Sequence, residues 1–264
     1  MAKVKKTTAK ASKKVTPAKS NAKEITINLD TFATPIAIVV AGIIIALMIF
    51  ITNRANSNTV EKGSKGANPT VDNSAEPPKG EDVTVTVGDD PYVGDKSKAK
   101  VAIVEFSDYQ CGYCKRHSDE TFPDIKKNYI DTGKIIYVFK EFPLGDSGLG
   151  YDTALAGTCV FEQVGREKFA EFHSSAMGAA SAAEVRAKAV AVGADGAKFD
   201  SCVSAQKFKD EIAGDKAEGS KAGVSGTPGF VVGKLDKDGN ITGPLVAGAY
   251  PYETFQSAIE ELLK

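Results

Sequence analysis

The pattern of apolar and polar positions predicts strands and helices in the part of the chain beyond residue 82. Residues 83–87 (VTVTV) alternate apolar and polar side chains, as a half-buried strand does. Residues 100–106 and 134–144 are nearly continuous apolar runs, which indicate strands buried on both faces. Between these two runs, residues 114–130 place apolar side chains at helical spacing, and Pro123 is expected to kink that helix.

The second half of this part predicts a block of helices followed by a hairpin. Residues from about 148 to 220 are Ala-rich, with a helical period and little strand character. Residues 229–248 contain two short apolar runs separated by Asp238 and Gly239, a strong signal for a hairpin turn. Residues 251–264 predict an amphipathic helix. The order of elements indicates an α/β fold, in which a βαβ unit and a terminal hairpin and helix form one mixed sheet and the helical block is inserted.

The N-terminal part carries a hydrophobic pattern of another kind. Residues 32–51 are twenty consecutive residues without a charge, long enough at about 1.5 Å per residue to cross the bilayer core, so we predict a single transmembrane helix over 32–52. A cleaved signal peptide is the alternative, but its apolar region is usually about 7–15 residues long. Because eight lysines precede this segment, the positive-inside rule places residues 1–31 in the cytoplasm and the chain beyond residue 52 outside.

Residues 53–82 are rich in Asn, Ser, Gly, Pro and charged side chains, which is typical of a flexible linker. The predicted organisation is therefore a basic cytoplasmic tail (1–31), a membrane anchor (32–52), this linker and a folded domain (83–264). The cysteines of that domain would face a compartment in which disulfides form and persist.

The charge distribution argues against a nucleic-acid surface on the folded domain. Nine of the 33 basic residues, but only two of the 34 acidic ones, lie before residue 55, so the remainder carries a net charge near −8. Phosphate binding needs concentrated Lys and Arg, and here only the tail is basic.

Two of the four cysteines form a C-x-x-C motif where a buried strand ends and a helix begins. At a helix N-terminus, unpaired N–H groups and the helix dipole favour a thiolate, which makes Cys111 the expected reactive thiol. Cys114, one turn further on, is less exposed and suited to resolve a mixed disulfide. A zinc site would need two more ligands, but Cys159, Cys202 and the two histidines form no second ligand pair. The motif therefore predicts redox chemistry, with no metal and no further cofactor.

Four sequence motifs, one of which contains the C-x-x-C pair, together resemble the DsbA-like branch of the thioredoxin superfamily. They are VEFSDYQCGYCKRH, VFKEFPL, KFDSCV and GVSGTPGFVVG, and they fall in order within residues 83–264. The resemblance implies a thioredoxin-like fold with a helical insertion over about 148–220. It also implies thiol–disulfide exchange as the activity.

The resemblance implies roles for residues around the motif. Cys111 would be the nucleophile and Cys114 the resolving thiol. Pro228 would be a cis-proline that faces both, and it exposes the backbone of Thr227 to pair with a substrate like an added strand. Tyr113, between the two cysteines, is expected to contact the substrate.

Three features near the motif leave questions open. Glu105, six residues before Cys111, matches an acid that in relatives lies below the active site. A buried carboxylate there could relay a proton to or from Cys114, and a strand-end salt bridge is the alternative. The dipeptide between the cysteines is Gly-Tyr and lacks the histidine of the best-known relatives, which leaves the oxidising strength open. His117 lies one turn after Cys114 and is expected to point elsewhere, with tuning of the site as the alternative.

The remaining cysteines, Cys159 and Cys202, lie 43 positions apart in the helical block. Several DsbA-like proteins carry a second disulfide in this region, so the resemblance implies a structural disulfide between them. Two buried free thiols are the alternative.

We therefore expect a membrane-anchored, extracytoplasmic, monomeric oxidoreductase that forms disulfides in exported proteins. Its partners would be reduced or unfolded exported proteins and a DsbB- or VKOR-like membrane reoxidase. A thiol reductase or disulfide isomerase is one alternative. A tethered module that binds peptides in a thioredoxin-like groove is another, from a different functional class.

Overall fold

The computed structural model describes residues 80–264. The predicted tail (1–31), the predicted anchor (32–52) and residues 53–79 of the predicted linker lie outside the described residues. Within residues 80–264, no helix is both long enough and apolar enough to cross a membrane.

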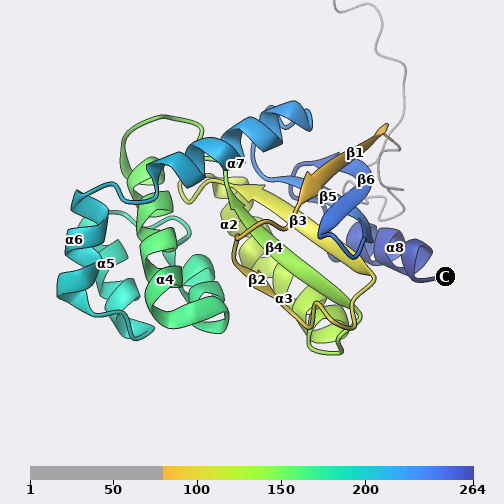
Figure 1. The fold of residues 1–264 in the computed structure, drawn as a ribbon, viewed down its shortest axis with the longest axis horizontal. Helices are drawn as coiled ribbons and strands as arrows, with labels where there is room; N and C mark the ends of the chain where they lie inside the picture. Colours follow the sequence, from red (N-terminus) through yellow and green to blue (C-terminus); the bar gives the residue numbers. More distant parts are fainter. Residues whose placement is uncertain (1–79) are drawn as a thin grey trace, which may run out of the picture. The chain divides into compact units, whose positions relative to one another are not determined.

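A six-stranded mixed sheet lies at the centre of the described residues, with the strand order β1-β6-β5-β3-β4-β2 (Figure 1). Its strands are β1 (Asp82–Thr86), β2 (Tyr92–Val93), β3 (Val101–Ser107), β4 (Ile135–Glu141), β5 (Gly229–Leu235) and β6 (Asn240–Ala247). β3 and β4 pair in parallel, and the other neighbouring strands pair antiparallel. The predicted strands and hairpin are confirmed. The two-residue strand β2 was not predicted, because so short a segment has no periodicity to detect.

The helices follow the predicted order. They are α2 (Gly112–Arg116), η1 (His117–Thr121), α3 (Phe122–Ile125), η2 (Lys126–Ile130), α4 (Leu149–Ala176), α5 (Ala182–Ala191), α6 (Gly196–Ser204), α7 (Lys209–Lys221) and α8 (Tyr252–Leu263). The run from α2 to η2 alternates α-helical turns with the π-helical turns η1 and η2. Pro123 lies inside this run, directly after η1, as the second residue of α3.

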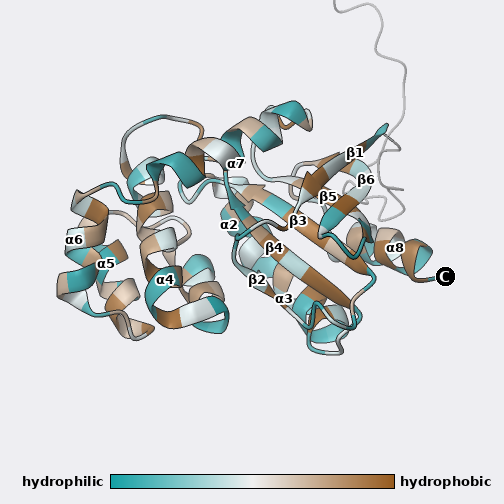
Figure 2. Cartoon of the chain, in the orientation of Figure 1, coloured by the Kyte–Doolittle hydropathy of each residue, from teal (hydrophilic) through white to brown (hydrophobic). Residues whose placement is uncertain are grey.

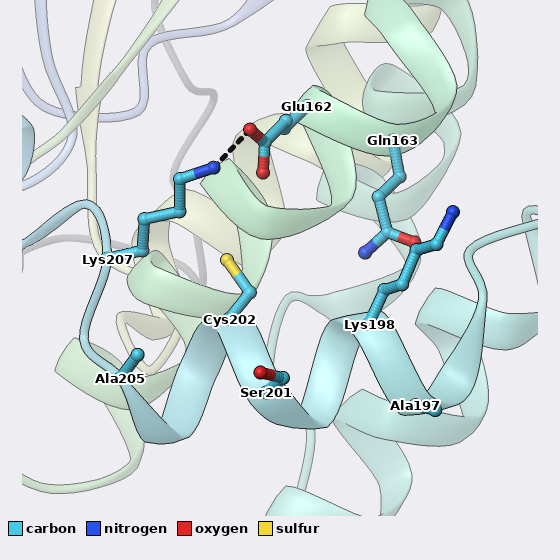
Figure 3. A pocket seen from close by; sticks show the side chains of 8 residues that line it. All are labelled: Glu162, Gln163, Ala197, Lys198, Ser201, Cys202, Ala205 and Lys207. Carbon is cyan, nitrogen blue, oxygen red and sulfur yellow. Dashed lines mark hydrogen bonds and ion pairs between the residues drawn. The ribbon is translucent and has the colours of Figure 1, made fainter.

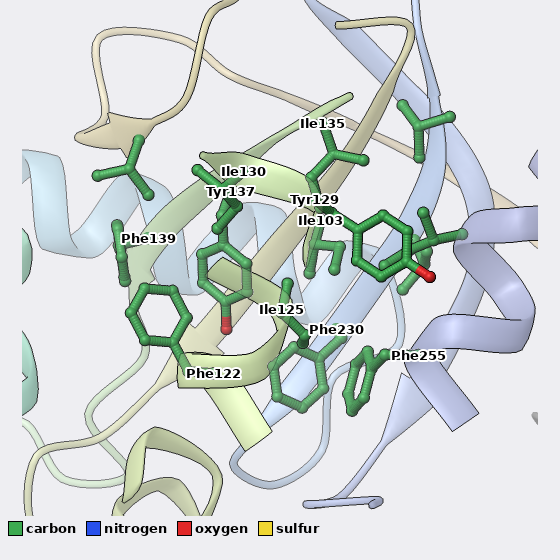
Figure 4. Close-up of a cluster of buried hydrophobic side chains, with 14 of the residues drawn as sticks. Ile103, Phe122, Ile125, Tyr129, Ile130, Ile135, Tyr137, Phe139, Phe230 and Phe255 are labelled. Carbon is green, nitrogen blue, oxygen red and sulfur yellow. The ribbon is translucent and has the colours of Figure 1, made fainter. Parts of the chain in front are cut away.

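The central strands β3 and β4 are buried along their whole length, and their alternating side chains form two cores. On one face, Ile103 and Tyr137 pack with residues of α3, η2 and α8 (Figure 4). On the opposite face, Val104 and Ile136 pack with Ala222 and other residues near the end of α7. Hydrophobic residues are accordingly concentrated along β3 and β4 (Figure 2). Glu105 shares the face of Ile103, so its carboxyl group lies on the side of the sheet covered by α3, η2 and α8.

The predicted helical insertion is present as α4 to α7, but it is not a separate unit. α4 lies between the sheet and the pair α5 and α6 (Figure 1). Gly165, with φ of 75°, interrupts α4 in a conformation that favours glycine. Beyond this break, Phe169 packs into the core of the sheet. The second half of α4 is therefore part of the core of the sheet.

A buried ion cluster joins α7 to the sheet. The Lys140 ammonium, on β4, contacts the carboxylate of Asp90 and lies 3.0 Å from Asp215 Oδ1 and 2.9 Å from Glu218 Oε2. Lys140, Asp90 and Asp215 are all buried. Burial raises the pKa of both aspartates, and the Lys140 charge opposes that rise. The lysine is therefore the countercharge that makes burial of these carboxylates tolerable.

We predict that Lys140→Met lowers the free energy of unfolding by about 3–5 kcal/mol, because it leaves buried carboxylates without a countercharge. Lowering the pH should reduce this loss, since buried carboxylates with raised pKa values then take up protons. Urea unfolding of the full-length chain at two pH values measures both effects. Lys168→Met is the matched control, because Lys168 pairs with Glu171 on the exposed surface; it should cost less than about 1 kcal/mol. Equal losses of unfolding free energy in the two variants would contradict the role of Lys140 as the countercharge of the buried carboxylates.

A disulfide joins Cys159 of α4 to Cys202 of α6. The implied pairing is therefore present, and the alternative of two free thiols does not apply to this structure. Cys202 also lines a surface hollow of about 760 Å³, whose polar rim includes the Glu162–Lys207 ion pair (Figure 3). The bond fastens α6 to α4, the helix that reaches the sheet.

We predict that replacing both Cys159 and Cys202 by Ala lowers the free energy of unfolding by about 4 kcal/mol in the chain-entropy model for a loop of this length. Urea unfolding of the full-length chain without reductant measures the loss. In a mass map of the unreduced wild type, neither of these two thiols should be alkylated. Alkylation of both, or an unchanged unfolding curve in the double variant, would contradict this prediction.

Candidate active site

The C-x-x-C motif begins where β3 leaves the sheet, and Asp108 fixes the turn that follows. Its carboxylate accepts hydrogen bonds from the backbone N–H groups of Gln110, at 2.8 Å, and Leu144, at 2.9 Å. Its carbonyl oxygen accepts from the N–H of Cys111 at 3.0 Å. This one residue therefore joins the turn after β3 to the turn after β4. Neither Asp108 nor Leu144 was singled out from the sequence.

The two thiols occupy different environments. Cys111 is partly exposed and is the N-cap of α2, whereas Cys114 lies one turn further on and is fully buried. Both are free thiols. Burial raises the pKa of the Cys114 thiol well above its usual range, and the negative charge of Glu105 adds to this rise. Cys111 is therefore the thiol that an incoming sulfur can reach, while Cys114 is held inside as a protonated thiol.

The Thr227–Pro228 peptide bond is cis, and it brings the preceding carbonyl group to the thiol pair. The Sγ–H of Cys111 donates to the carbonyl oxygen of Thr227 at 3.2 Å. Pro228 is buried, and its own carbonyl oxygen accepts from the N–H of Gly248 at 2.8 Å. Contact with Gly248, the residue after β6, thus holds this loop in place and leaves the backbone of Thr227 beside Cys111.

A shallow hollow of about 290 Å³ opens next to this loop. It is lined by Tyr113, Arg116, Thr227, Ala247, Gly248, Ala249 and Tyr250. Tyr113 is 62% exposed, and the centroid of its ring lies 5.2 Å from the guanidinium carbon of Arg116. Nη2 of Arg116 donates a hydrogen bond to the carbonyl oxygen of Ala249 at 2.7 Å. An aromatic ring and a cation therefore border the approach to Cys111. Arg116 was not identified from the sequence.

Glu105 is 2% exposed and lies on the side of β3 that faces α2. Its Oε2 accepts a hydrogen bond from the hydroxyl of Tyr137 at 2.9 Å, whereas its Oε1 has no hydrogen-bond partner. Burial raises the pKa of Glu105 to about 7, and the hydrogen bond from Tyr137 opposes the rise. Among the described residues no Lys or Arg pairs with it, which favours a proton-exchanging carboxyl over a strand-end salt bridge.

His117 contacts Tyr137, and its ring nitrogens make no hydrogen bond with either thiol. It is buried, and its Nε2 lies 3.0 Å from the hydroxyl oxygen of Tyr137. Burial lowers the pKa of His117 to about 3, so its imidazole is neutral at ordinary pH. Tyr137 was not singled out from the sequence, although Glu105 and Tyr137 occupy inward positions of the same parity on two predicted strands. That parity is the signal that could have found it.

Residues 80–264 contain no group of three or more His, Cys, Asp and Glu side chains placed to hold a metal ion. The chemistry available at this site is that of two thiols, one carboxyl group with a pKa near neutrality and the polar groups around them.

Comparison with known proteins gives the family. A family model described as thioredoxin matches residues 86–261, about two thirds of the chain. A candidate protein-disulfide oxidoreductase of Rickettsia felis is 35% identical over 92 residues, which cover 35% of this chain and 31% of that protein. Disulfide bond formation protein D of Bacillus subtilis is 43% identical over 49 residues, 19% of this chain and 22% of that protein. The chain thus spans about a third or less of the length of these curated relatives.

Solved structures share the fold over a larger part of the chain. Alpha-DsbA1 of Wolbachia pipientis matches with a TM-score of 0.59 and 26% identity, covering 67% of this chain and 92% of that protein. Oxidised BdbD of Bacillus subtilis matches in fold with a TM-score of 0.58, at 20% identity, over 70% of this chain and 99% of that one. With the thiol pair, the cis-proline and the helical insertion in their places, the chain belongs to the DsbA-like thiol:disulfide oxidoreductases of the thioredoxin superfamily.

Proposed function

We propose that this protein is a membrane-anchored, extracytoplasmic thiol:disulfide oxidoreductase that forms disulfides in exported proteins through Cys111 and Cys114. The observation that carries the proposal is the asymmetry of the two thiols. Cys111 is partly exposed and lies against the carbonyl group of Thr227, while Cys114 is buried above a carboxyl group. Such a pair can accept an incoming thiolate at one sulfur and retain the departing sulfur inside.

The cis-proline loop and the neighbouring hollow would hold the substrate. An extended polypeptide that pairs with the backbone of Thr227 places its cysteine next to Cys111, as strand addition does at other sheet edges. The exposed ring of Tyr113 and the guanidinium of Arg116 border this position. They offer flat, adaptable contacts to the residues that flank the reacting cysteine, which suits a protein that acts on many sequences.

The reaction is a two-electron exchange in two steps. A substrate thiolate attacks Sγ of Cys111 in the Cys111–Cys114 disulfide, which forms a mixed disulfide and releases Cys114 as a thiolate that takes up a proton. A second substrate thiolate then attacks the substrate sulfur of the mixed disulfide and releases Cys111. The substrate leaves with a disulfide, and the protein is left as a dithiol.

The residues before the folded domain support the proposed compartment. The uncharged segment at 32–52 would anchor the chain, and the lysines before it would keep the N-terminus in the cytoplasm. The linker 53–82 would let the catalytic domain reach reduced or unfolded exported proteins. A membrane reoxidase of the DsbB or VKOR type would then accept the two electrons from Cys111 and Cys114.

We predict that Cys114→Ala traps mixed disulfides between Cys111 and exported proteins, because the thiol that resolves the intermediate is absent. The full-length variant is expressed in bacteria, thiol exchange is stopped with acid, and free thiols are then alkylated. The adducts are separated on gels with and without reductant. The same proteins should be recovered when the reduced variant is mixed with purified exported substrates in their disulfide form, because Cys111 then attacks a substrate disulfide and releases one substrate thiol.

The matched control is the Cys111→Ala, Cys114→Ala double variant, which keeps the Cys159–Cys202 disulfide and should yield no adducts. Adducts of equal intensity in this control would mean that another thiol reacts and would contradict the proposal. A complete lack of adducts with Cys114→Ala, together with reversible peptide binding, would favour the peptide-binding module instead.

A further inference from the structure

Three buried polar side chains form a row beneath the thiol pair. The hydroxyl of Tyr137 donates to Oε2 of Glu105 at 2.9 Å, and Nε2 of His117 lies 3.0 Å from the same hydroxyl oxygen. All three side chains are buried. The two ends of the row, Oε1 of Glu105 and Nδ1 of His117, have no hydrogen-bond partner. Unpaired buried polar atoms are costly, so their presence in a functional site requires an explanation.

The hydrogen bonds in this row run in one direction. A phenol has a single proton, and Tyr137 gives it to Glu105, so its oxygen must accept a hydrogen bond from His117. His117 is therefore the tautomer that carries its proton on Nε2. Because burial lowers the pKa of His117 to about 3, the imidazole remains neutral and keeps this role at ordinary pH. Its ring is packed against Phe230 and Phe255, with centroids 4.5 and 5.2 Å away.

This direction decides where the proton of neutral Glu105 lies. Oε2 accepts from Tyr137, so the acidic proton is on Oε1, the oxygen without a partner. Burial raises the pKa of Glu105 to about 7 while the Tyr137 hydrogen bond opposes the rise, so this proton can be gained and lost near neutral pH.

The groups around Glu105 leave Cys114 as the expected exchange partner. The titratable side chains that interact with its charge are Tyr109, Cys114, Tyr137 and Glu141. Tyr109 and Tyr137 are phenols whose pKa values burial raises well above their usual range, so both stay protonated. Burial also raises the pKa of Glu141, whose carboxyl group accepts a hydrogen bond from the hydroxyl of Tyr109. The residues opposite Glu105 on the neighbouring strands are Phe139 and Phe230, and beyond His117 lies His173, which burial also keeps neutral.

We propose that Tyr137 and His117 are positioning residues that hold the exchangeable proton of Glu105 on Oε1, so that the carboxyl group exchanges it with Cys114. This inference rests on the proposed function of the thiol pair. When a substrate thiolate attacks Cys111, the Cys111–Cys114 bond breaks and the new bond to Cys111 forms. The departing Cys114 thiolate takes the proton from Oε1, and the hydroxyl of Tyr137 stabilises the carboxylate that remains. In the reverse step Cys114 returns its proton to Oε1 as it attacks the mixed disulfide.

The test measures this reverse step in the full-length chain. Oxidised glutathione converts Cys111 to a mixed disulfide, and acid quenching with mass spectrometry follows its displacement by Cys114. In the wild type the rate should rise with pH through the pKa of Glu105, because only the carboxylate can accept the proton. Tyr137→Phe removes the hydroxyl that stabilises the carboxylate. The midpoint of the plot of displacement rate against pH should shift upward by about one pH unit in this variant, and the rate below that midpoint should fall about tenfold.

His117 is tested by three further variants. His117→Phe removes the donor to Tyr137 and should shift the midpoint upward by less than Tyr137→Phe. His117→Gln offers an amide N–H to the same oxygen and should restore a midpoint near that of the wild type. Adding His117→Phe to Tyr137→Phe should cause no further shift, because the row is already broken. The comparison of His117→Phe with His117→Gln tests the inference even if Tyr137→Phe fails to fold.

The matched control is Tyr129→Phe. Tyr129 lies in the same core cluster and donates to Oε1 of Glu260 at 2.9 Å, so this variant also removes one Tyr–Glu hydrogen bond. Its midpoint should be that of the wild type. Equal midpoints in Tyr137→Phe, His117→Phe and the wild type would contradict the positioning role of Tyr137 and His117. They would leave the proposed function intact. If wild-type Cys111 formed no glutathione adduct at all, the proposed function itself would fail.

Discussion

The complete burial of β3 is the constraint on which the site depends. All seven of its residues are inside, and helices cover both of its faces. A strand held in this way fixes where the chain leaves the sheet. It therefore fixes the turn at Asp108, the start of α2 and the position of Cys111 at the surface. The same burial forces a glutamate into the interior, where its carboxyl group loses water and holds its proton more tightly.

The site is asymmetric as a result. On the outer side, Cys111 meets the backbone of Thr227, and the exposed ring of Tyr113 lies nearby. On the inner side, Cys114 meets a carboxyl group near its point of half-protonation, which Tyr137 and His117 hold in one orientation. Sulfur exchange thus takes place at the surface, while the proton that accompanies it stays in the interior. The buried ion cluster at Lys140 supports this arrangement from the other face of the sheet, because it holds α7 against β4.

Local patterns in the sequence were sufficient to predict most strands and helices and to identify Cys111 and Cys114 as the reactive pair. The apolar runs marked the buried strands, Asp238 and Gly239 marked the hairpin, and C-x-x-C at a strand–helix junction indicated redox chemistry. Family resemblance added the cis-proline and the second disulfide, both of which the structure contains. The contacts that adjust the chemistry were not accessible in this way. Lys140 meets carboxylates 50 and 75 residues away, and Glu105 meets a tyrosine 32 residues away, so each depends on strand register and helix placement.

The reduction potential of the Cys111–Cys114 pair tests the central claim most directly. It can be measured by equilibrating the full-length chain with glutathione buffers and counting alkylated thiols by mass spectrometry. A protein that donates disulfides should show a value of about −120 to −180 mV. A value of about −270 mV, that of thioredoxin, would contradict the account and identify a reductase that receives its electrons from a donor in the membrane.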